Sequence, residues 1–133
     1  MGQQQLLLLI LAAIIVGMAV VLGINMFGQN AAQANQDAVT QDVLTIASRA
    51  QGWYRRPVQM GGGGRSFAGL NNNLAAINFP TTNANGTYTF TNGNATTATI
   101  TGTGVEDANG NGTPLVVTAV ITPDSVRSLT VTP

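Results

Sequence analysis

The sequence predicts an α+β fold, in which a long N-terminal α-helix of about 50 residues packs on a small antiparallel β-sheet head, as in a lollipop. Three observations predict it. No residue from Leu6 to Ile24 has a polar side chain. Apolar residues then recur at helical spacing as far as Trp53. After residue 83, threonines alternate with other residues between Asn-Gly turns, which is typical of short antiparallel strands.

The first element, residues 1–29, is predicted to be an apolar helix half. Three glutamines precede its apolar run: Gln3, Gln4 and Gln5. As a helix, Leu6 to Ile24 would be roughly 28 Å long, close to the ~30 Å hydrocarbon core of a bilayer. A secretory signal peptide is disfavoured, because no basic residue precedes the run and the run is longer than an h-region. A single-pass anchor is a second interpretation, although the nearest basic residue is Arg49.

A third interpretation is a helix that first lies in the membrane and then packs against copies of itself. No charged residue occurs before Asp37, so a dry helix bundle would contain no unpaired charge. Small residues spaced four apart would let helices approach closely. They are Ala13, Gly17, Ala19 and Gly23. We predict that these four residues and the three glutamines make the assembly contacts. The glutamine amides would provide hydrogen-bonding groups without a fixed charge.

The second element, residues 30–56, is predicted to be the amphipathic continuation of the same helix. Its apolar residues are spaced four, three, four and three apart, which places them on one stripe. They are Val39, Val43, Ile46, Ala50 and Trp53. Pro57 is expected to stop the helix. Three glycines in the first half predict a bend or a locally unwound stretch. They are Gly17, Gly23 and Gly28.

This organisation resembles that of the type IV pilins and type IV pilin-like filament subunits. The shared features are a polar tip, an apolar run, an amphipathic continuation and a small β-rich head. The resemblance covers residues 1–56 in organisation, and the head in architecture alone. It implies a precursor in the inner membrane, cleavage after a glycine by a prepilin-type peptidase, and ATP-driven assembly by pilus machinery. The product would be a helical filament with the apolar halves at its centre.

Pilins usually have a glutamate at the fifth mature position. If Met1 is the first mature residue, Gln5 occupies that position, and if cleavage follows Gly2, Leu7 occupies it. We interpret Gln5 as a neutral substitute for the glutamate in the first case.

The third element, residues 57–82, is predicted to be a Gly-rich connector. The run Gly61 to Gly64 is interpreted as structural rather than as a phosphate loop, because no Lys-Ser or Lys-Thr pair follows it. Residues 70–79 are expected to form a short helix or an irregular cover. The pair Arg55-Arg56 could bind an anionic partner, cap the helix end or form a salt bridge between subunits.

The fourth element, residues 83–133, is predicted to be an antiparallel β-meander whose apolar face lies on the helix stripe. The expected strands are residues 87–91, 97–101, 115–122 and 126–132. Between two of them, Asp107, Asn109 and Asn111 match the first half of a calcium loop. The twelfth position is Thr118 instead of a bidentate glutamate, so a plain hairpin turn is the alternative interpretation.

Asn-x-Thr sequons at predicted turns make three asparagines possible glycosylation sites. They are Asn85, Asn94 and Asn111.

The composition disfavours catalysis and nucleic-acid binding. The chain contains neither His nor Cys, which provide most general bases, nucleophiles and metal ligands. Five basic and five acidic residues give zero net charge, whereas nucleic acid requires clustered Lys and Arg. We therefore predict no catalytic residues, no bound cofactor and no nucleic-acid partner.

The predicted function is that of a structural subunit of an extracellular, cell-surface filament that contributes to adhesion, motility or a scaffold. Its expected partners are other copies of itself, the inner membrane before assembly, and the assembly machinery. The alternative is a single-pass membrane-anchored binding module or a pseudopilin of a secretion system.

Overall fold

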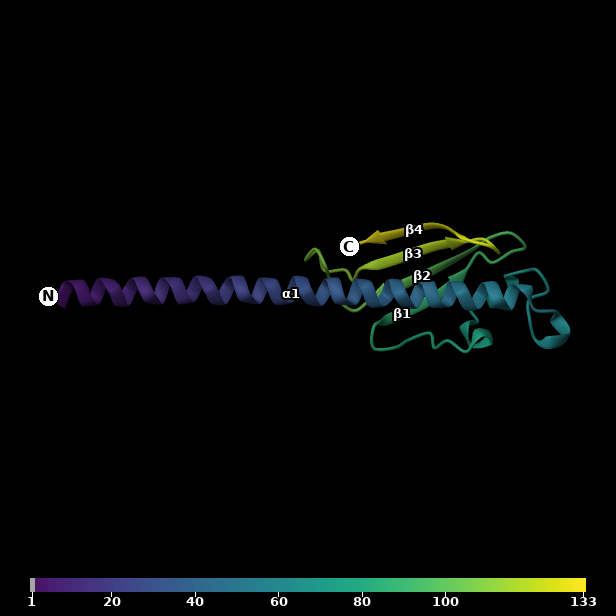
Figure 1. The fold of residues 1–133 in the computed structure, drawn as a ribbon, viewed down its shortest axis with the longest axis horizontal. Helices are drawn as coiled ribbons and strands as arrows, with labels where there is room; N and C mark the ends of the chain where they lie inside the picture. The colour runs from purple at the N-terminus through teal and green to yellow at the C-terminus, as the bar shows by residue number, and fades with distance from the viewer. Residues whose placement is uncertain (1) are drawn as a thin grey trace.

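The structure is a computed structural model that describes residues 2–133. One helix, α1 (Gly2–Arg55), runs along the long axis of the molecule, and a four-stranded sheet packs on its C-terminal half (Figure 1). The N-terminal half extends away from this head (Figure 1). The predicted α+β fold is therefore confirmed. We call residues 2–29 the projecting half of α1 and residues 30–55 its packed half.

Helix α1 is 54 residues long and is continuous through its glycines. The expected bend or unwound stretch at Gly17, Gly23 and Gly28 was wrong. A glycine in a helix interior costs up to about 1 kcal/mol, but it does not interrupt the hydrogen-bond ladder. Kinks usually need a proline, a π-bulge or a group inserted into the ladder, and the helix has none of these. The helix ends at Arg55, shortly before Pro57, as expected.

The sheet is an antiparallel meander in the order β1-β2-β3-β4, as predicted. Its strands are β1 (Gly86–Thr91), β2 (Ala98–Gly104), β3 (Val116–Ile121) and β4 (Val126–Thr132). Alternate residues of the first three strands are buried, which is the period of a sheet with one face on a core. The register of β3 against β4 shifts between Val120 and Ile121.

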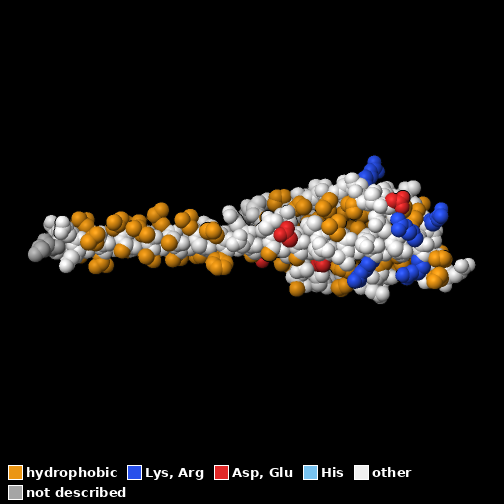
Figure 2. Space-filling view, in the orientation of Figure 1, with side chains coloured by type: hydrophobic (Ala, Val, Ile, Leu, Met, Phe, Trp, Pro, Cys, Tyr) orange, Lys and Arg blue, Asp and Glu red, His pale blue; other side chains and the backbone are white. Residues whose placement is uncertain are grey.

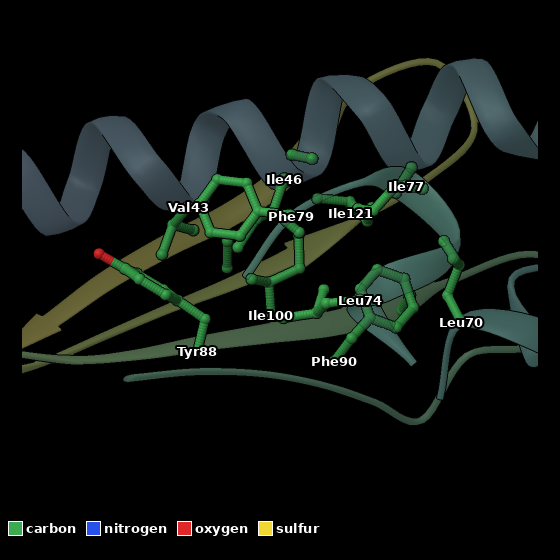
Figure 3. Packing of buried hydrophobic residues seen from close by; sticks show 14 of the residues in the cluster. Val43, Ile46, Leu70, Leu74, Ile77, Phe79, Tyr88, Phe90, Ile100 and Ile121 are labelled. Carbon is green, nitrogen blue, oxygen red and sulfur yellow. The ribbon is translucent and has the colours of Figure 1, made fainter. Parts of the chain in front are cut away.

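The core lies between the packed half of α1 and the sheet. All five residues of the predicted stripe are buried. Val43 and Ile46 face Tyr88, Ile100 and Ile121 of the sheet (Figure 3). A Cβ at Gly102 in β2 would lie 2.8 Å from a methyl of Val39, so glycine is what permits this close approach of helix and sheet.

The connector consists of three short 3-10 turns, η1 (Val58–Met60), η2 (Ala68–Leu70) and η3 (Leu74–Ile77). Its glycine run closes the C-terminal end of α1, because the amides of Gly63 and Gly64 donate to the carbonyls of Trp53 (2.9 Å) and Arg56 (3.0 Å). A Cβ at Gly63 would lie 2.3 Å from the Trp53 ring. The run therefore has a structural role within the chain, since it satisfies carbonyls that a helix end leaves open.

Candidate assembly surface

The projecting half of α1 exposes apolar side chains on all sides. Figure 2 shows those on one face of the molecule. Leu6 is 62 % exposed and Phe27 is 79 % exposed, and the large apolar residues between them are also more than half exposed. Soluble monomers rarely expose a contiguous apolar surface of this extent. Removing each large side chain from water gains on the order of 1.5–3 kcal/mol. The projecting half therefore requires an apolar environment around its whole circumference.

Helix α1 is long and apolar enough to cross a membrane, and it is the only such helix within residues 2–133. The apolar window that meets this criterion has no residue buried by the head. A span inserted as a membrane-embedded precursor is consistent with this geometry.

The small residues of the projecting half lie on two different sides of the helix. Residues four apart share a face, so Ala13 lies beside Gly17, and Ala19 lies beside Gly23. The six residues that separate the two pairs rotate them by about 240°, which places the two faces about 120° apart. A Cβ at Gly17 or Gly23 would meet nothing within 4 Å. Each face is thus open to a second helix.

The three glutamines occupy the first turns of α1 and are exposed. Gln3, Gln4 and Gln5 are therefore presented at the far end of the molecule from the head (Figure 1). Within residues 2–133, no other side chain or backbone group bonds their amides. In a dry environment each amide would need a partner supplied by another molecule.

Asn35 joins the beginning of the packed half of α1 to the head. It is the one buried polar residue of the described chain, with 8 % of its surface exposed. Its Nδ2 donates to the carbonyl of Asn85 at 2.8 Å, and its Oδ1 accepts from the amides of Val105 and Glu106 at 3.0 and 3.3 Å. The absence of a side chain at Gly104 makes space for the Asn35 amide, because a Cβ at Gly104 would lie 2.3 Å from the Asn35 oxygen.

A second polar contact two turns further along α1 reinforces the first. Asp42 Oδ2 accepts hydrogen bonds from Asn83 Nδ2 (3.0 Å), from Asn85 Nδ2 (2.9 Å) and from the Tyr88 hydroxyl. Burial alone would raise the pKa of Asp42, but the bonds from Tyr88, Asn85 and Asn83 outweigh it and hold that pKa below its usual value. Burial, together with the Asp42 carboxylate, raises the pKa of Tyr88. Both contacts join α1 to the same end of the sheet, where β1 begins and β2 ends.

The predicted calcium residues form a tight turn in which their oxygens accept backbone hydrogen bonds. Asp107 Oδ2 accepts from Gly112 N at 2.6 Å, and its Oδ1 accepts from Asn109 N at 3.3 Å. Asn111 Oδ1 accepts from Thr113 N at 2.8 Å. These backbone bonds, led by that of Gly112, lower the pKa of Asp107. The described residues include no cluster of three or more acidic, His or Cys side chains. The geometry favours the hairpin-turn interpretation.

The three sequon asparagines differ in their surroundings. Asn94 and Asn111 are exposed in turns, and each accepts a hydrogen bond from the threonine of its own sequon, at 3.0 and 2.6 Å. The amide nitrogen of Asn85 is instead bound to Asp42. A glycan on Asn85 would have to displace that contact, whereas the other two sites are open.

The Arg55-Arg56 pair is divided between two roles. Arg55 forms a salt bridge with Asp124 at 3.0 Å and donates to the carbonyl of Pro123. Arg56 lines a groove of about 460 Å³ with Arg49 and Trp53.

Sequence reasoning did not single out Asn35, Asp42 or Tyr88 as contact residues. The available signal was weak: Asn35 and Asp42 are seven residues apart, which is two helical turns, and they flank the apolar stripe.

No protein-family model matches the chain, and no curated protein or solved structure matches it significantly.

Proposed function

We propose that this chain is the structural subunit of an extracellular pilus-like filament. The projecting halves of many copies would pack together as the filament core, and the β-rich heads would form its outer layer. The observation that carries the proposal is the continuous, uncharged apolar half-helix, whose large side chains are all more than half exposed because the head leaves them uncovered. The polymer, rather than a catalytic centre, performs the function, which is adhesion, motility or a scaffold at the cell surface.

Two features support a polymer rather than a permanent anchor. The close-approach faces of Ala13-Gly17 and Ala19-Gly23 let one helix contact two neighbours, whereas a dimer needs one such face. The glutamine tip precedes the apolar run, and its amides can bond to neighbouring helices in a filament. Before assembly, the same half-helix would lie in the inner membrane, from which pilus machinery would extract it, as in the family that the sequence resembles.

The second candidate is a single-pass membrane-anchored binding module, including a pseudopilin of a secretion system. The match between the length of the apolar run and the thickness of a bilayer favours it. It predicts that the chain remains in the membrane as a monomer or small oligomer.

Electron microscopy of material sheared from producing cells, combined with intact-mass analysis of the subunit, separates the candidates. We expect long fibres composed of this one chain. The intact mass also gives the position of the mature N-terminus and shows whether glycans are attached. Recovery of the chain solely from detergent-extracted membranes would refute the filament.

A further inference from the structure

The head is electrically polarised along the helix axis although the chain has no net charge. We call the end of the head where α1 terminates the distal end, and the end from which the projecting half leaves the proximal end. All five basic residues lie toward the distal end, in the last two turns of α1, in the connector and at the start of β4 (Figure 2). They are Arg49, Arg55, Arg56, Arg65 and Arg127.

Four of the five acidic residues lie toward the proximal end. Asp37 and Asp42 are on the packed half of α1, and Glu106 and Asp107 are in the loop that Asn35 holds beside that helix. The fifth acid, Asp124, is at the distal end, where it pairs with Arg55. Five arginines less one aspartate leave the distal end with four excess positive charges, and the four remaining acids balance them. Asp37 and Arg56 are about 28 Å apart along the helix.

The distal charges are largely unneutralised within the subunit. Arg55–Asp124 is the only salt bridge within residues 2–133. The groove between α1 and η3 is lined by Arg49 and Arg56 and has no acidic residue in its lining. Arg49 is held in place, because it donates to the carbonyl of Asn78 at 2.9 Å and lies over the Phe79 ring at 5.6 Å.

Trp53 also lines this groove. Its side chain is buried, and its indole N–H has no partner within the described chain. A buried donor without a partner is uncommon in native proteins. Because that nitrogen is itself buried, the positive charges of Arg49 and Arg56 are what would attract a carboxylate to the groove.

We propose that the acidic proximal end of one head binds the basic distal end of a second copy, with the groove between Arg49 and Arg56 receiving a carboxylate of that copy. The inference rests on the proposed filament. We assign the partner of the distal end as a second copy, because the four acidic charges at its proximal end equal the four excess positive charges at the distal end. A head-to-tail contact of this kind is heterologous, so it repeats without closing and adds a lateral bond between heads to the packing of the helices.

The test uses filaments of the full chain. We expect the concentration of released monomer, measured after sedimentation, to rise steeply as NaCl increases from about 0.05 M to about 0.5 M, because salt screens exposed charges. Arg56→Gln and Asp37→Asn should each raise the released monomer by about fivefold at low salt, the factor expected for one exposed ion pair, and should flatten the salt dependence.

Thr89 provides matched controls, because it is exposed on the outer face of β1, which lies between the two charged ends. Thr89→Glu changes the net charge as Arg56→Gln does, and Thr89→Lys changes it as Asp37→Asn does. Both controls should release monomer as the unmodified chain does. Filaments whose stability is independent of salt, or equal effects in the variants and their controls, would overturn this inference and leave the filament intact. Absence of filaments under all conditions would overturn the proposed function itself.

Discussion

The two halves of α1 belong to one continuous helix but meet opposite surroundings. The packed half buries one side of the helix, including the stripe of five apolar residues, against the head and exposes the opposite side. The projecting half is apolar on every side and covered on none. A helix with one apolar stripe needs one partner surface, whereas a helix that is apolar all round needs a complete shell. The comparison indicates that the head folds within one chain, whereas the projecting half depends on other molecules.

The comparison also separates stability from assembly. Substitutions in the packed half should act on the unfolding of the head, and those in the projecting half should act on association. Trp53 is the only tryptophan and is buried in the head, so its fluorescence reports on head unfolding alone.

The largest effect should come from a cavity in the packed half. Ile46 is fully buried against the sheet. Ile46→Ala should lower the free energy of unfolding of the head by about 2–5 kcal/mol, because it removes buried methyl groups and leaves a void. Urea unfolding in detergent, followed by Trp53 fluorescence, measures the change. Ile15→Ala in the projecting half is the control and should leave the midpoint unchanged. A similar loss in both variants would show that the two halves are not energetically separate.

A charge in the projecting half should have the next largest effect, but on assembly. Val16 is 62 % exposed in the monomer and would be surrounded by lipid or by other helices after insertion. A carboxylate at the centre of an apolar span costs about 2.5–3.5 kcal/mol. Val16→Asp should abolish filaments in sheared material while leaving the fluorescence-detected unfolding of the head unchanged. Val16→Leu is the matched apolar control. Normal fibres from the aspartate variant would mean that this surface is not in the core.

Asn35 stands at the boundary between the two halves, so its removal tests how firmly they are joined. Asn35→Ala leaves the amides of Val105 and Glu106 without their acceptor, which should cost about 1–3 kcal/mol of head stability. The projecting half should lose its fixed direction as well. Unfolding by urea measures the first effect, and disorder of fibres in electron micrographs measures the second. Gln33→Ala, an exposed change nearby, is the control. Unchanged stability would show that water replaces the lost acceptor.

The comparison also explains what could be predicted from the sequence. The helix, its stripe and the strands follow from local periodicity, which the sequence displays directly. Asn35 and Asp42 contact residues 41 to 71 positions away, and no local pattern specifies such partners. The straightness at Gly17 and Gly23 was missed for another reason. Helix propensity predicts the energetic cost of a glycine but not whether the helix bends there.

The connector illustrates the same limit. Its glycine run was correctly interpreted as structural. The sequence could not show which carbonyls at the helix end the connector amides bond, because that depends on how the chain turns back over the helix end. The carbonyls are those of Trp53, Tyr54 and Arg56. The candidate assembly residues were found from composition and spacing alone, because an exposed apolar helix needs no tertiary contact to be recognised.

A smaller effect should appear in the pH dependence of head stability. The folded pKa of Asp42 is lowered, so its carboxylate contributes stability that is fully present above the unfolded pKa of about 4. That contribution is lost as the pH falls below this value and through the folded pKa. Asp42→Asn should reduce the acid sensitivity of the unfolding midpoint between about pH 5 and pH 2. Asp107→Asn is the comparison for an exposed carboxylate that accepts backbone bonds. An unchanged acid transition in the Asp42 variant would exclude this contribution.

The smallest expected effect concerns Gln5, at the far end of the projecting half. If Met1 is the mature first residue, Gln5 takes the position of the usual pilin glutamate and its amide finds a partner in a neighbouring helix. Gln5→Leu would remove a hydrogen bond of about 0.5–1.5 kcal/mol, so the monomer concentration in equilibrium with filaments should rise by up to about tenfold. Gln5→Glu tests the charge directly: it should assemble if the neighbouring terminal amine is close and should fail if the site is dry and neutral. Sedimentation measures both. If Gln5→Leu gives the same filament yield as the unmodified chain, the tip contributes nothing to assembly. Assembly would then depend on the apolar faces alone.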